Sequence, residues 1–152
     1  MSDLPKISYS DGGVHVTVDL RALDQRMREA QQWLGDRVLE DCKACMPLLT
    51  GSLQQRSHTE DDGKKVVFPG PYARYQYGGK VMVDSVTGKG PRKIPTGPGE
   101  YILRFRKGAK LVATDRPLKY STPQAVPQWF EHAKRQNKQF WIDGVKEKIG
   151  GK

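Results

Sequence analysis

The sequence has no long hydrophobic run, and no apolar stretch approaches the roughly 20 residues that a membrane-spanning helix needs. Residues 1–11 also lack the basic start and apolar stretch of a signal peptide. Hydrophobic residues make up 36% of the 152, which is below the usual share of a globular protein. We therefore expect one domain over residues 1–152, made in the cytoplasm, with a small core and no membrane partner.

Cysteine is scarce, and the two cysteines, Cys42 and Cys45, have the spacing of a C-x-x-C motif. A zinc site needs four ligands, and beyond His58 as a third ligand no fourth is evident. A redox pair would lie at a helix start after a strand, whereas this pair falls at the end of a predicted helix, on its apolar stripe. The sequence therefore favours two reduced, buried thiols that pack as small apolar side chains.

Sequence patterns typical of active sites are also missing. The three histidines lie far apart, and none belongs to a Ser/His/Asp or H-E-x-x-H arrangement. The adjacent carboxylates Asp61 and Asp62 fall in a predicted turn, which suits solvent better than acid–base chemistry. Residues 88–90 lack the second half of a phosphate-binding loop. We expect no catalytic, cofactor or metal site and predict that the protein is not an enzyme.

Charge is plentiful but unevenly spread. The formal net charge is +9. Residues 1–63 carry 7 basic and 11 acidic side chains, a net charge of −4, whereas residues 64–119 carry 13 basic and 3 acidic ones, a net charge of +10. A basic middle segment of this kind favours a polyanion or an acidic protein surface as its partner.

Hydrophobic periodicity predicts two long helices. From Leu20 the apolar residues recur at steps of three or four, after the N-cap candidate Asp19 and before Pro47, which disfavours helix in the residue preceding it. A second apolar stripe follows Pro127 and ends at Gly150. We expect both stripes to pack on one sheet and to be buried together through Leu23, Met27, Ala30, Leu34, Val38, Phe130, Ala133 and Trp141.

Alternating apolar residues and turn signals predict several short strands. The strand candidates are residues 14–18, 53–60, 64–68 and 101–106. A hairpin turn is indicated at residues 61–63, and residues 84–100 and 108–126 are expected to be long exposed loops. Together these elements predict an α+β fold, with a small antiparallel β-sheet packed by a long N-terminal helix and a C-terminal helix.

Aromatic and basic residues are interleaved in the middle of the chain, at Tyr72, Arg74, Tyr75 and Tyr77, with Arg104 and Arg106 further on. Such a mixture can stack on single-stranded nucleic acid. Tyrosine and arginine are also the residues that protein interfaces favour. Because no nucleic-acid-binding motif accompanies them, the protein interface is the favoured interpretation.

Three segments carry a resemblance to one protein family. PLLTGSL at residues 47–53 follows a long helix and looks like the P-x-x-T-G-x-L element of phage head–tail connector and tail-completion subunits. PYARYQYG at residues 71–78 is similar to their P-Y-A-x-x-x-[YE]-x-G segment, in the version found in minor capsid proteins of phages of Gram-positive bacteria. The stretch from Trp129 to Trp141 resembles their closing helix.

The resemblance implies a structural neck subunit of the virion, which joins the DNA-filled head to the tail. Its partners would be other copies in a ring of roughly six or twelve, the adjoining neck, portal-side and tail proteins, and DNA in the channel without sequence specificity. Relatives have a short connection where this chain has a basic insertion at about residues 80–120. We expect this insertion to become ordered on assembly.

Specific residues follow from this interpretation. Thr50 and Gly51 are predicted to turn the chain out of the long helix, and Tyr72 to anchor the next segment. The residues predicted at assembly interfaces are Tyr72, Arg74, Tyr75, Tyr77, Lys89, Arg92, Lys93, Arg104 and Arg106. The alternatives are a nucleic-acid-binding module that uses the basic middle segment and, as a weaker hypothesis, a small basic nuclease.

Overall fold

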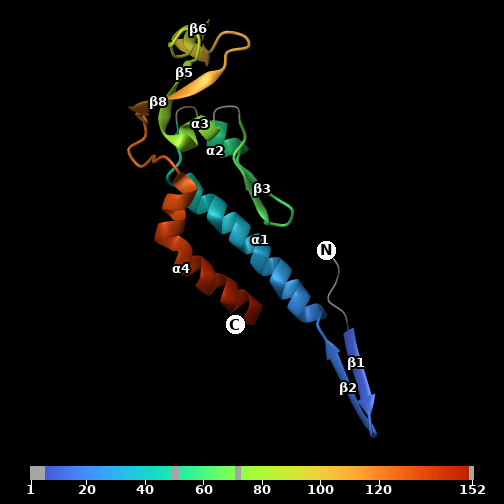
Figure 1. The fold of residues 1–152 in the computed structure, drawn as a ribbon. Coiled ribbons are helices and arrows are strands. Elements are labelled where there is room, and N and C mark those ends of the chain that lie inside the picture. Colours follow the sequence, from blue (N-terminus) through green and yellow to red (C-terminus); the bar gives the residue numbers. More distant parts are fainter. Residues whose placement is uncertain (1–5, 49–51, 71–72, 151–152) are drawn as a thin grey trace.

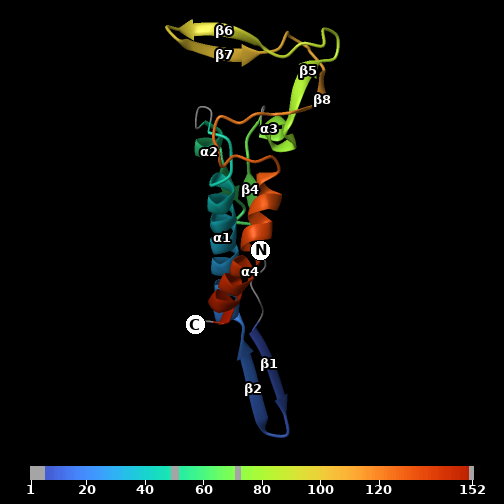
Figure 2. The ribbon, with the colours of Figure 1, turned by 90° about the vertical axis from the view of Figure 1, so that its left-hand side faces the viewer.

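A computed structural model describes residues 6–48, 52–70 and 73–150 and confirms the α+β class. Two long helices, α1 (Arg21–Lys43) and α4 (Trp129–Gly150), pack against each other and form the body of the molecule. Short antiparallel strands project beyond both ends of this body, so that the molecule is elongated (Figures 1 and 2). Thr50, Gly51 and Tyr72 lie outside the described residues.

Helix α1 occupies most of the stretch that its periodicity predicted. Asp19 does not serve as the N-cap residue, which is Leu20, but its carboxylate accepts a hydrogen bond of 3.0 Å from the backbone N–H of Arg21. The helix ends at Lys43, four residues before Pro47. Asp19 therefore still satisfies a donor that the helix start leaves free.

The core lies between the second half of α1 and the first half of α4. Its buried members are Cys42, Cys45, Met46, Trp129, Ala133 and Trp141, and Ala30 is also buried. Leu34, Val38 and Phe130 are partly buried against this cluster. The predicted packing of the two helix stripes is thus confirmed for this part of the helices.

Leu23 and Met27 do not join the core, because their side chains remain 37% and 47% exposed. The indole ring of Trp33 packs directly on Gly144 of α4, where an added Cβ atom would clash with it, and the ammonium of Lys148 lies 5.5 Å from the ring centroid of Trp33. The described chain therefore covers the apolar side chains in the first turns of α1 only in part.

The strands form four two-stranded antiparallel sheets in the described chain, not the one sheet that was expected. The pairs are β1 (Lys6–Asp11) with β2 (Val14–Asp19), β3 (His58–Glu60) with β4 (Lys65–Val67), β5 (Lys80–Asp84) with β8 (Leu111–Pro117), and β6 (Arg92–Gly97) with β7 (Glu100–Arg104). The expectation that one sheet covers both stripes was wrong because the two helices bury their stripes mainly against each other.

Three local predictions also need correction. The expected strand at residues 53–60 is replaced by helix α2 (Ser52–Arg56) followed by the short strand β3. The hydroxyl of Ser57 donates to the carbonyl of Leu53 at 2.6 Å, a bond that holds this turn in a helical form. Strands β6 and β8 occupy parts of the two segments that were expected to be loops. The short helix α3 (Ala73–Gly78) precedes β5, between the helical body and these strands.

The predicted turn at residues 61–63 is confirmed. Its backbone lies very close to helix α1. Asp61, Asp62 and Gly63 have φ values of 51°, 54° and 80°. A Cβ atom added to Gly35 would lie 2.4 Å from the carbonyl oxygen of Gly63, and the Gln31 side chain donates to the same oxygen at 3.1 Å. The β3–β4 hairpin can therefore lie directly on α1 only because position 35 has no side chain.

Candidate functional site

The most basic part of the molecule is a segment that we call the basic arm, defined as residues 80–117. It contains the β5–β8 and β6–β7 pairs and lies beyond one end of the helical body (Figure 2). It carries nine basic and three acidic side chains, a net charge of +6. The exposed basic residues are Lys80, Lys89, Arg92, Lys93, Arg104, Arg106, Lys107, Lys110 and Arg116.

Two arginines face each other across the β6–β7 pair. The register places Arg92 opposite Arg104, and both are exposed. Like charges directly opposite on a strand pair are destabilising. Next to them, the Lys93 ammonium lies 4.6 Å from the ring centroid of Tyr101. This concentration of cations suits an anionic surface supplied by another molecule.

Arg106 has a different environment from the other predicted interface residues. Its guanidinium pairs with the nearly fully buried carboxylate of Asp84 through nitrogen–oxygen distances of 2.5 and 3.1 Å. The Arg106 hydrogen bond, helped by a bond of 2.8 Å from the backbone N–H of Val86, holds the pKa of Asp84 below its ordinary value. Arg106 thus stabilises the end of the β5–β8 pair at which Asp84 is opposite Leu111, while its side chain remains 42% exposed.

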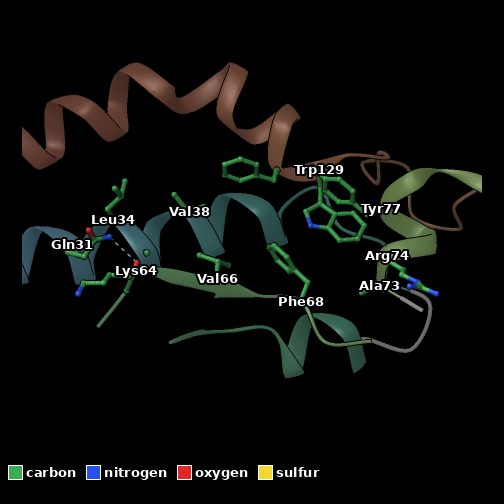
Figure 3. Close-up of a pocket in the computed structure, with 13 residues that line it drawn as sticks. Gln31, Leu34, Val38, Lys64, Val66, Phe68, Ala73, Arg74, Tyr77 and Trp129 are labelled. Carbon is green, nitrogen blue, oxygen red and sulfur yellow. Dashed lines mark hydrogen bonds between the residues drawn. The ribbon is translucent and has the colours of Figure 1, made fainter. Parts of the chain in front are cut away.

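An apolar groove of about 630 Å³ lies on the helical body, between α1, β4, α3 and the start of α4 (Figure 3). The residues that line it are Gln31, Leu34, Gly35, Val38, Gly63, Lys64, Val66, Phe68, Ala73, Arg74, Tyr77, Trp129 and Phe130. The Trp129 indole N–H is buried and has no hydrogen-bond partner among the described residues. Trp129 is almost completely buried, so its ring supports the floor of the groove and its N–H is not open to an occupant.

The described part of the predicted aromatic and basic cluster, residues 73–77, is divided between the core and the surface. Tyr77 packs edge-on against Trp129, with ring centroids 4.9 Å apart, and burial raises the pKa of its hydroxyl. Arg74 is exposed, and its guanidinium lies 4.7 Å from the ring centroid of Tyr75. Tyr77 and Arg74 therefore belong to the groove, as a wall and as part of its rim.

The sequence analysis missed a third surface, the β1–β2 hairpin. Its register puts Ile7, Tyr9, Val14, Val16 and Val18 on one face, and all five are 43–64% exposed. Only the second strand was predicted. The alternation of Ile7 and Tyr9 with serines, directly before the Gly12-Gly13 turn, was the signal that could have indicated the first strand.

The cysteines are buried, as the sequence predicted, and they are free thiols. Burial raises the pKa of Cys42 to about 12, so its thiolate is strongly disfavoured. In the described ranges, no cluster of three or more His, Cys, Asp and Glu side chains could hold a metal ion. Likewise, no helix within those ranges is long and apolar enough to cross a bilayer.

Comparisons with protein-family models, with curated proteins and with solved structures find no match to the chain.

Proposed function

We propose that the protein is a structural subunit of the neck of a tailed bacteriophage, where copies form a ring that joins the DNA-filled head to the tail. The proposal combines the three motif resemblances with one structural observation. The helical body carries an uncovered apolar hairpin at one end and an uncovered basic arm at the other (Figure 1). Both are built to contact other molecules.

The exposed hairpin argues for assembly. A two-stranded hairpin alone is marginally stable in water, and its outer edges leave backbone groups unpaired. The β1–β2 pair has an apolar face and makes no extensive contact with another element of the described chain. In a ring, neighbouring subunits would cover such surfaces, and the small core of a single subunit would be supplemented by buried area between copies.

The basic arm suits contact with an acidic protein surface. Strong pairing with phosphates would hold DNA in place, because affinity grows with each phosphate neutralised, and a channel must let DNA slide. An arm that docks on an adjacent subunit or on a neighbouring neck ring avoids this difficulty. Charge complementarity of that kind would set register and partner choice more than affinity.

A nucleic-acid-binding module remains a second candidate because Arg92 and Arg104 are opposed. A phosphate between two guanidinium groups would relieve their repulsion. This candidate requires binding of the free protein to DNA or RNA that weakens steeply as salt rises.

The decisive experiment measures assembly and position together. Native mass spectrometry of the purified chain should show a closed homo-oligomer, and images of virions containing a labelled copy should place it between head and tail. Phage lacking the protein should accumulate filled heads and free tails. A monomer that binds DNA with strong salt dependence, and that is absent from virions, would favour the nucleic-acid-binding module instead.

A further inference from the structure

The β1–β2 hairpin has two chemically different faces. On the apolar face, Ile7 is opposite Val18 and Tyr9 is opposite Val16. The other face carries only polar side chains, among them the opposed pair Ser8 and Thr17. An apolar face of this size is normally covered, since exposed clusters of large apolar side chains mark interaction sites.

The hairpin cannot reach the groove of its own chain. Two perpendicular views show that it continues past the first residue of α1, away from α4 and from the basic arm (Figures 1 and 2). The groove begins at Gln31, three turns further along α1, and extends to Trp129 and Phe68. A straight helix of some ten residues, about 15 Å long, therefore separates the two surfaces within one subunit.

The groove has the properties that the hairpin needs in a receptor. Its walls are mostly apolar, and Val66, Phe68 and Phe130 are only partly buried. Its volume is within the range of sites that hold several side chains.

The charges at the two surfaces are also complementary. The exposed cations Lys64 and Arg74 lie at the rim of the groove. Asp11, at the tip of the hairpin, lies on the same face as Tyr9 and is exposed. A carboxylate on the edge of an apolar face would meet a positive rim and help to select one orientation.

We infer that the hairpin of one copy docks, apolar face inward, in the groove of a neighbouring copy. Tyr9, the largest side chain on that face, is the anchor. Its ring enters the apolar groove, and its hydroxyl keeps the hydrogen bond of 3.4 Å that it donates to the Asp11 carboxylate. Asp11 lies against Lys64 at one end of the groove, whereas Arg74 lies at the other end (Figure 3).

This contact joins two different patches, so it is head-to-tail. A head-to-tail contact repeats from copy to copy until the chain of subunits closes, and it generates a ring or an open filament. The inference deepens the proposed function and rests on it, since a neck ring is the setting in which the contact closes. The hairpin contact itself is inferred from the apolar and charged side chains of the hairpin and the groove.

The first test compares the two faces of the hairpin. Tyr9→Asp and Val16→Asp place a charge on the apolar face, and Thr17→Asp places the same charge on the polar face as a matched control. We expect the apolar-face variants to raise the concentration for half-assembly by about tenfold or more, because a central aromatic anchor dominates an interface of this kind. Thr17→Asp should assemble as the native chain does, and circular dichroism should show unchanged helix content in all three.

The second test traps the contact. Tyr9→Cys in one preparation is mixed with Lys64→Cys in another under mild oxidation. Head-to-tail docking gives a disulfide-linked dimer in the mixture and little in either preparation alone, where the native cysteines are buried. A native chain that stays monomeric and yields no cross-link overturns the inference, as does equal loss of assembly in Thr17→Asp.

The two proposals fail in different ways. A closed ring that forms unchanged with Tyr9→Asp overturns the hairpin contact and leaves the neck function standing, with a different occupant for the groove. Cross-linked dimers or filaments from a protein that is absent from virions uphold the contact and overturn the neck function.

Discussion

The indole N–H of Trp141 donates a hydrogen bond of 2.7 Å to the carboxylate of Asp41, and this bond joins α4 to α1 across 100 residues of sequence. Asp41 also pairs with Arg37 one turn earlier, at 3.1 Å, and its side chain is only 11% exposed. Two donors thus satisfy a carboxylate that is mostly withdrawn from water. The pairing fixes the rotation and sliding position of the two helices.

Removing this bond should weaken the helix pair. Trp141→Phe keeps an aromatic ring in the core but removes the donor, and we expect it to lower the free energy of unfolding by about 1.5–3 kcal/mol. Denaturant unfolding followed by circular dichroism measures the change. Lys138→Ala, an exposed position on the same helix, is the control and should change stability by less than about 0.5 kcal/mol. Equal effects at both positions would contradict the assigned role of the bond.

The two ends of the α1 stripe should respond differently to truncation. Leu34 is partly buried against the core, whereas Leu23 is 37% exposed near the start of α1. We expect Leu34→Ala to lower the free energy of unfolding by about 2 kcal/mol, which is the low end for such changes, because the groove already leaves part of the side chain uncovered. Leu23→Ala should cost less than about 0.5 kcal/mol in the isolated subunit. A large loss at Leu23 would mean that another surface covers it.

The contact between Gly35 and the β3–β4 turn should not tolerate a side chain. Alanine at position 35 favours helix by about 1 kcal/mol. However, its Cβ would lie 2.4 Å from backbone of Gly63, and that backbone cannot move without displacing the hairpin. We expect a net loss of about 1–2 kcal/mol for Gly35→Ala, measured by thermal unfolding. Gly70→Ala, which would meet nothing within 4 Å, should be close to neutral.

Acid should loosen the basic arm through Asp84. Because the Arg106 hydrogen bond lowers the pKa of this carboxyl in the folded chain, its stabilising contribution is fully present above the ordinary carboxyl pKa of about 4. It is lost as the pH falls through the lowered folded value. The hydrogen-exchange protection factors of β5 and β8, which correct for the intrinsic exchange rate at each pH, should therefore fall below about pH 4 in the native chain. Arg106→Gln should show faster exchange already at neutral pH and a weaker acid dependence.

Charge reversal in the basic arm separates protein contact from DNA contact. Arg92→Glu combined with Lys93→Glu should abolish head–tail joining while heads retain their DNA, because we expect these side chains to face acidic protein. Infection assays and electron microscopy of lysates measure both properties. A control with Lys146→Glu, on the exposed surface of α4, should join heads and tails normally. Leaky heads with intact joining would show that the arm contacts DNA.

Local patterns in the sequence determined the two long helices, the strand at residues 14–18 and the turn at residues 61–63, because periodicity, Pro47 and turn residues act over a few neighbours. The burial of the cysteines also followed from their place on the α1 stripe. The concentration of basic and aromatic residues in the middle of the chain was equally visible. These features predicted the α+β class and most of the candidate interface residues.

Only the tertiary structure decided how those residues are grouped. The stripe of α1 continues through Leu23 and Met27, but these two side chains stay partly exposed, because the buried contact between α1 and α4 is concentrated at the other end of α1. Tyr77 became a wall of the groove and Arg106 became the partner of Asp84, since each depends on a residue 22 or more positions away. The sequence predicts loops at strands β6 and β8, because proline and glycine interrupt these segments and no regular apolar alternation marks a buried face. The sequence alone determined local structure and charge, and packing between distant segments decided which surfaces remain open for assembly.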